Sequence, residues 1–140
     1  MSRFEIKAKD GMARLGLFTT EHGTVRTPLL MPVVHPGKSE IKSSEFVSQY
    51  GFQMVITNSY IIKSQEKYRT VAMDEGVHGL LDFDGPIMTD SGTFQMYYHN
   101  LPEEEIDPKE ILNFQKNIGS DIGTILDAFS DPDVGMSQVQ

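Results

Sequence analysis

Residues 86–98, PIMTDSGTFQMYY, contain the transition that decides how this chain folds. The segment begins as an apolar, β-prone run, breaks at Asp90, Ser91 and Gly92, and then becomes aromatic and apolar again. A short apolar run bounded by turn-forming residues is typical of a strand that is buried on both faces. We therefore expect a strand that ends at Asp90 and places its carboxylate at the edge of a sheet.

The segments on either side of this strand alternate between strand and helix patterns. Further buried strands are predicted within residues 27–34, 52–60 and 121–129. Helices are predicted within 42–51, 64–81 and 107–120, with a stop at Gly76 in the second and Asp107 and Pro108 opening the third. Such alternation predicts an α/β fold with about four parallel strands joined by right-handed crossovers.

The first 27 residues follow a different pattern. Apolar and polar residues alternate with a period of two around Asp10-Gly11 and His22-Gly23, which are turn-forming pairs. This pattern predicts an antiparallel β-hairpin region over residues 1–27, outside the parallel sheet. The parallel α/β region then occupies residues 28–140.

Composition limits the function classes. The chain has 140 residues, of which 39% are hydrophobic and 23% charged, as expected for one soluble globular unit. It contains no apolar run near the roughly 20 residues of a membrane helix and no secretory leader, so we expect a cytoplasmic protein without membrane contact. A formal net charge of -8 argues against a surface that grips nucleic-acid phosphates by itself.

The sequence offers no obvious metal ligands. It has no cysteine, which excludes disulfides and thiolate metal sites within the chain. The four histidines, at positions 22, 35, 78 and 99, are too scattered to form a recognisable ligand pattern. We therefore predict no metal and no cofactor in this chain.

Three polar residues follow predicted strands and are candidate site residues. Asn58, Asp90 and Asp127 each come after mainly apolar strand residues, so their side chains should converge on one rim of the sheet. Taken singly, each is better explained as a turn or helix cap, and Phe94 as packing. Their coincidence at successive strand ends favours a functional site.

Four segments of the chain resemble the tRNA-guanine transglycosylase family, in its archaeal, archaeosine-type branch. They are TPLLMPVVHP (27–36), VITNSYII (55–62), GVHGLLDFDGPIMTDSGTFQ (76–95) and GSDIGTILDAFSDPD (119–133), in the family's order and at compatible spacing. Thr93 departs from the glycine or serine that is more usual there. The resemblance implies a (β/α)8 TIM barrel, with residues 28–140 as its first half.

The resemblance also implies an activity. In the archaeal enzymes a guanine in the tRNA D-loop is exchanged for 7-cyano-7-deazaguanine at the glycosidic bond. The family implies homodimers and a structural zinc, which we expect in a carboxy-terminal part that this chain lacks. The chain should therefore be truncated or one piece of a split enzyme, and inactive alone.

Residue roles follow from the same resemblance. Asp90 is the base-side carboxylate that acts as general acid and base, and it has also been viewed as the nucleophile; a later family aspartate is usually favoured for that role. The substrate-binding residues are then Ser91 and Asp127, which hydrogen-bond the heterocycle, Phe94, which stacks on the flipped base, Gln95, which supports the pocket, and Asn58. Two alternatives stay open: a TIM-barrel glycoside hydrolase, and a non-catalytic binding or assembly subunit.

Overall fold

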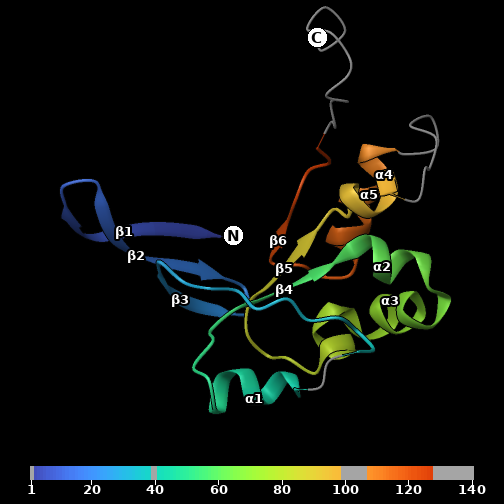
Figure 1. Ribbon diagram of the computed structural model, residues 1–140, viewed down its shortest axis with the longest axis horizontal. Helices are drawn as coiled ribbons and strands as arrows, with labels where there is room; N and C mark the ends of the chain where they lie inside the picture. Colours follow the sequence, from blue (N-terminus) through green and yellow to red (C-terminus); the bar gives the residue numbers. More distant parts are fainter. Residues whose placement is uncertain (1, 39–40, 99–106, 128–140) are drawn as a thin grey trace, which may run out of the picture.

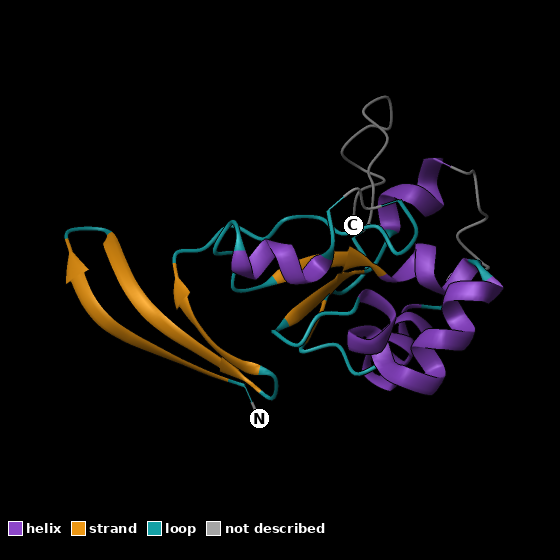
Figure 2. Cartoon of the chain, turned by 90° about the horizontal axis from the view of Figure 1, so that it is seen from below, coloured by secondary structure: helices purple, strands orange, loops and turns teal. Residues whose placement is uncertain are grey.

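The structure is a computed structural model that describes residues 2–38, 41–98 and 107–127. Its amino-terminal part is an antiparallel sheet in the order β1 (Arg3–Asp10), β2 (Ala13–Thr20) and β3 (Gly23–Thr27). This sheet projects to one side of the helical part of the molecule (Figure 2). The period-two prediction is thus confirmed, with three strands where a hairpin region was expected.

The second sheet is parallel and has the order β4 (Val55–Asn58), β5 (Ile87–Asp90) and β6 (Ile122–Gly123). Its helices are α1 (Ser43–Ser48), α2 (Ser59–Ser64), α3 (Glu66–Leu81), α4 (Thr93–Tyr98) and α5 (Pro108–Asn117) (Figure 1). Asp107 caps α5 and accepts a hydrogen bond from the Lys109 backbone N–H at 2.8 Å, as predicted. The mixed α/β class is therefore confirmed, whereas a closed barrel stays a prediction.

Two of the four predicted parallel strands are much shorter than expected. Residues 28–34 form only an isolated bridge between Val33 and Ile56, flanked by hydrogen bonds from Val34 N to Ile56 O and from Ile56 N to Pro32 O. Pro28 and Pro32 lack the N–H groups that a full ladder would need. Of the last strand, predicted within residues 121–129, the described residues up to 127 form only Ile122–Gly123, and residues 128–129 lie outside the described part of the chain.

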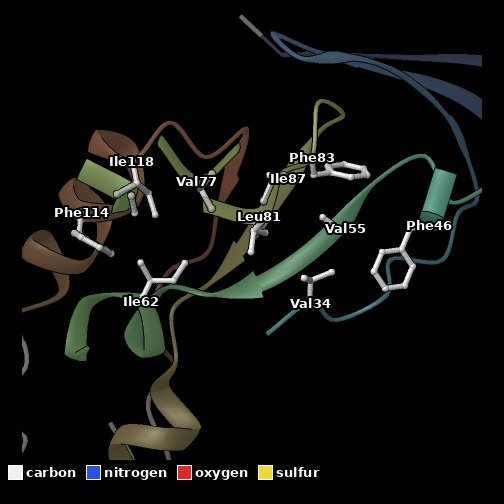
Figure 3. Close-up of a cluster of buried hydrophobic side chains, with 11 residues drawn as sticks. Val34, Phe46, Val55, Ile62, Val77, Leu81, Phe83, Ile87, Phe114 and Ile118 are labelled. Carbon is white, nitrogen blue, oxygen red and sulfur yellow. The ribbon is translucent and has the colours of Figure 1, made fainter. Parts of the chain in front are cut away.

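The core lies between the parallel sheet and the helices that follow its strands (Figure 3). Its centre comprises Val55, Ile62, Val77, Ile87 and Ile118, which are all fully buried. Each such side chain stabilises the fold by about 1.5–3 kcal/mol relative to an exposed one. No helix within the described ranges is both long and apolar enough to cross a membrane.

Helix α3 contains a kink at Gly76, where the sequence predicted its end. Gly76 has φ 77° and ψ 171°, and helical structure resumes after it and ends at Leu81. The kink frees the Val77 N–H, which donates to the Ile118 carbonyl at 2.7 Å and ties α3 to the end of α5. The predicted stop at Gly76 is confirmed as a break in the helix. The sequence did not predict that helical structure resumes after it, because the resumption depends on this tertiary hydrogen bond.

The antiparallel sheet is attached to the parallel sheet at Asp121, whose carboxylate is fully buried. One oxygen, Oδ2, accepts from Ile87 N at 2.9 Å and contacts His78 Nε2 at 3.2 Å. The other, Oδ1, accepts from the backbone N–H of His22 at 3.3 Å and lies 3.1 Å from His22 Nδ1. Because His22 lies in the turn between β2 and β3, this one carboxylate joins both sheets to α3.

Burial would raise the pKa of the Asp121 carboxyl, but hydrogen bonds from Ile87, Thr20 and His22 outweigh it and hold that pKa below its ordinary value. Burial and the nearby His22 ring lower the pKa of His78, only partly opposed by Asp121. At neutral pH the junction therefore pairs an ionised carboxylate with a neutral His78 imidazole.

We predict that Gly76→Ala lowers the free energy of unfolding by about 1–3 kcal/mol, because the φ and ψ of Gly76 lie in a region almost restricted to glycine. Urea unfolding of the chain measures this. Glu75→Ala is the matched control: it places alanine one residue earlier, in an exposed helical position, and should change stability by less than about 0.5 kcal/mol. Equal stability of the two variants would show that the kink is not required.

Candidate active site

The carboxyl ends of β4 and β5 place Asn58 beside Asp90. The two residues are partners in the parallel ladder. Asn58 Nδ2 donates to Asp90 Oδ2 at 3.1 Å and to Gln95 Oε1 at 2.9 Å, while its Oδ1 accepts from the Ile61 N–H at 3.0 Å and caps α2. The Asn58 amide therefore has both donor hydrogens and one acceptor site in use, which fixes its orientation.

The Asn58 contact holds the Asp90 carboxylate by one oxygen. Among the described residues, Asn58 is the one that donates a hydrogen bond to the Asp90 side chain. Asp90 is also partly exposed. The main chain is fixed as well, because Ser59 Oγ donates to the Asp90 carbonyl at 2.7 Å. Asp90 is thus oriented by the protein and still able to meet a substrate.

Gly92 is required by the turn that follows Asp90. Its φ is +80°, and a Cβ at this position would overlap the Tyr60 side chain and lie 2.9 Å from Asn58 Oδ1. A larger residue would therefore displace the side chain that holds Asp90. Glycine at position 92 of the Asp-Ser-Gly segment therefore has a steric reason.

A second group of contacts joins the rim to the segment after β6. The Thr93 hydroxyl lies 3.0 Å from Ser91 Oγ and accepts from the Asp127 backbone N–H at 3.1 Å. The Ser91 N–H donates to Thr124 Oγ1 at 2.6 Å. Thr93 and Thr124 are positioning residues that the sequence did not single out. Thr93 was noted only as a departure from the family pattern.

The structure brings the predicted site residues to one end of the parallel sheet. Asn58, Asp90 and Gln95 are linked directly, and Ser91 is buried beside them. Asp127 reaches this end through its backbone and is exposed, although it lies beyond the short strand β6. Phe94 stands at 59% exposure on α4. This placement agrees with the predicted rim, while the roles of these residues stay predictions.

This arrangement suits proton transfer or nucleophilic attack on a bound substrate. A carboxylate held at one oxygen presents the other in a defined direction, as general acid/base and covalent catalysis both require. Neighbouring hydroxyls and an exposed aromatic ring are groups that can bind a planar, polar heterocycle. The geometry alone does not identify which heterocycle binds.

Comparison with known proteins identifies the family to which this chain belongs. The family described as TGT, queuine tRNA-ribosyltransferase, matches residues 9–140. A tRNA-guanine(15) transglycosylase of Methanothermobacter thermautotrophicus is 53% identical over 94% of this chain and 19% of its own length. Proteins of the same name from Methanosarcina acetivorans and Methanopyrus kandleri are 50% and 47% identical, over 94% and 98% of this chain and 26% and 29% of their own lengths.

The chain thus spans about a fifth to under a third of the length of these curated relatives. The family match covers all of the candidate site residues, from Asn58 to Asp127, and most of the antiparallel sheet. The resemblance stated from the sequence motifs is confirmed: this chain belongs to the tRNA-guanine transglycosylase family.

Proposed function

We propose that the protein carrying these residues is an archaeosine-type tRNA-guanine transglycosylase, which exchanges a D-loop guanine of tRNA for 7-cyano-7-deazaguanine. The observation that carries this proposal is the Asp90 carboxylate at the end of β5, held by Asn58 in a chain of this family. The names of the relatives support guanine 15 as the exchanged base.

Base exchange asks for the kind of group that Asp90 offers. The guanine leaves with the electron pair of its glycosidic bond and gains a proton, while positive charge develops at the ribose carbon. The incoming base then loses a proton and forms the new bond. Asp90 acts on the base as general acid and base, or attacks the ribose carbon, with a second aspartate from outside this chain in the remaining role.

Base recognition is assigned to the neighbouring rim residues. Asp127 accepts hydrogen bonds from the two donors on guanine's Watson–Crick edge, because the two oxygens of a carboxylate fit that edge. Ser91 hydrogen-bonds the heterocycle, Phe94 stacks on it, and Gln95 and Asn58 keep Asp90 in place. The exposure of Phe94 and Asp127 supports these assignments.

The same proposal extends to architecture and partners. The parallel strands β4 to β6 form the first part of a TIM barrel in a cytoplasmic homodimer, and basic regions outside this acidic chain bind the tRNA. The family's structural zinc needs cysteine ligands, and this chain has none, so the residues present do not fit that zinc. It belongs to a part of the protein outside these 140 residues.

Asp90→Asn should abolish guanine exchange while tRNA binding persists. The experiment uses a chimera in which this chain replaces the matching segment of the Methanosarcina acetivorans relative, and measures incorporation of labelled guanine into tRNA. General acid/base catalysis is typically worth a hundredfold to ten-thousandfold, so the loss should be at least about 100-fold. Asp84→Asn, exposed in the loop before β5, should keep full activity.

Full exchange by the Asp90 variant would refute its catalytic role. Release of guanine without incorporation of the labelled base, in the unsubstituted chimera, would instead favour the glycoside hydrolase alternative.

The substitution Asn58→Asp separates the two roles of Asn58, which positions Asp90 and caps α2. The new carboxylate still accepts the Ile61 N–H and keeps the cap, but it offers no N–H to Asp90 and places a second negative charge beside it. We expect kcat for exchange to fall at least about tenfold with KM nearly unchanged, and the unfolding temperature to move little. A fall in stability that accounts for the lost activity would reduce Asn58 to a structural cap.

Asp127→Asn should weaken the choice of base more than the chemistry. The amide turns one acceptor into a donor that faces guanine's donors, and such a mispaired group, covered by the bound base, costs about 1–3 kcal/mol, or roughly 5-fold to 150-fold in affinity. Competition between labelled guanine and 7-cyano-7-deazaguanine for the chimera measures it. If the variant keeps the affinity for both bases and the selectivity between them, Asp127 does not bind the base and its role is structural.

A further inference from the structure

A cluster of histidine and aspartate side chains lies at the end of the parallel sheet opposite the candidate active site. His22, His78 and Asp121 each present one ligand atom, and these atoms all lie within 4.8 Å of one another. Asp121 contacts the first residue of β5, whereas Asp90 is the last, so about 10 Å of strand separates the two sites. The candidate catalytic residues make no use of this cluster.

The distances fit an ion held between the three side chains. Asp121 oxygens lie 3.1 Å from His22 Nδ1 and 3.2 Å from His78 Nε2. Ligand atoms that bind one tetrahedral ion with bonds of about 2.0–2.1 Å are separated by roughly 3.3 Å. The imidazole rings are stacked, with centroids 3.6 Å apart, so both ring nitrogens address the same carboxylate.

The surrounding chain orients the ligands. Backbone N–H groups of Ile87 and His22 each donate to a different oxygen of Asp121 and fix its plane. Such contacts behind the ligands are typical of metal sites, because they set the direction of the lone pairs.

The cluster is open to solvent on one side. His22 and Asp121 line a cavity of about 500 Å³ together with Thr20, Glu21, Lys116 and Ser120. This cavity gives an ion an entry path and leaves room for water as a further ligand. The His22 side chain is 35% exposed, whereas that of His78 is 16% exposed.

We propose that His22, His78 and Asp121 bind a divalent first-row transition-metal ion such as Zn²⁺, which fastens the antiparallel sheet to the base of the parallel sheet. Two imidazoles and one carboxylate form a borderline donor set that suits this class of ion better than Mg²⁺ or Ca²⁺. The sequence-based expectation of no metal rested on scattered histidines, and that premise does not hold for His22 and His78.

The role is structural. The three ligands come from the β2–β3 turn, from α3 and from the residue before β6, which are far apart in the sequence. An ion that binds all three stabilises the folded chain and has little affinity for the unfolded one. The position agrees with α/β barrels, where the amino-terminal end of the strands serves stability rather than chemistry.

The test is Zn²⁺ binding by the chelator-stripped 140-residue chain, measured by calorimetry, with Co²⁺ absorption as a report on ligand geometry. The absence of cysteine removes thiolate sites from the measurement. We expect one saturable site and a rise in unfolding temperature that follows its occupancy. His22→Phe keeps a ring to stack on His78 but removes a ligand nitrogen, and should weaken Zn²⁺ binding at least about 100-fold.

His35→Phe is the matched control. His35 packs edge-on against Tyr68, away from the cluster, and this variant should bind Zn²⁺ like the unsubstituted chain. Asp121→Asn provides a second variant in case the first alters folding, and it should also lose the site. No saturable binding by the unsubstituted chain, or equal binding by the His22 variant, would overturn the proposal and leave a hydrogen-bonded His–Asp junction.

Discussion

The register between β4 and β5 is the constraint on which the rest of the structure depends. Val55 pairs with Ile87 at one end of the ladder and Asn58 with Asp90 at the other. Side chains alternate along each strand, so a shift of either strand by one residue would turn its own core residue, Val55 or Ile87, out of the core and separate Asn58 from Asp90. The same pairing therefore fixes the packing and the candidate active site.

The two ends of β5 have different tasks. At the carboxyl end, the side chain of Asp90 receives one hydrogen bond from the described residues, that of Asn58, and the residue stays partly exposed. At the amino end of β5, the buried carboxylate of Asp121, the residue before β6, accepts the Ile87 N–H and contacts two imidazoles. An oriented but accessible carboxylate suits chemistry, whereas a buried and fully satisfied one suits stability. Two aspartates in neighbouring strand regions thus acquire opposite characters from their surroundings.

Local patterns predicted α1, α3, α5 and the strand-end position of Asp90, because hydrophobic periodicity and helix caps act over a few residues. They did not predict the short helices α2 and α4, and residues 59–60, expected as strand, begin α2. They failed where a distant partner decides. Gly76 interrupts the helix as predicted, but the helical turn after it was not foreseen because it depends on the hydrogen bond to Ile118. His22 and His78 look scattered because 55 intervening residues separate them, and Asp121 brings them together only in the folded chain.

Thr93 shows how a departure from a family pattern can be explained by contacts. Its hydroxyl touches Ser91 Oγ and accepts the Asp127 N–H, so it links two residues assigned to base binding. Serine would supply the same hydroxyl, whereas glycine would leave the Asp127 N–H to another acceptor. The methyl group of threonine limits side-chain rotation and holds the hydroxyl in place. Relative to serine, threonine therefore preserves and stiffens the connection between the segment after β5 and the segment after β6, and relative to glycine it adds that connection.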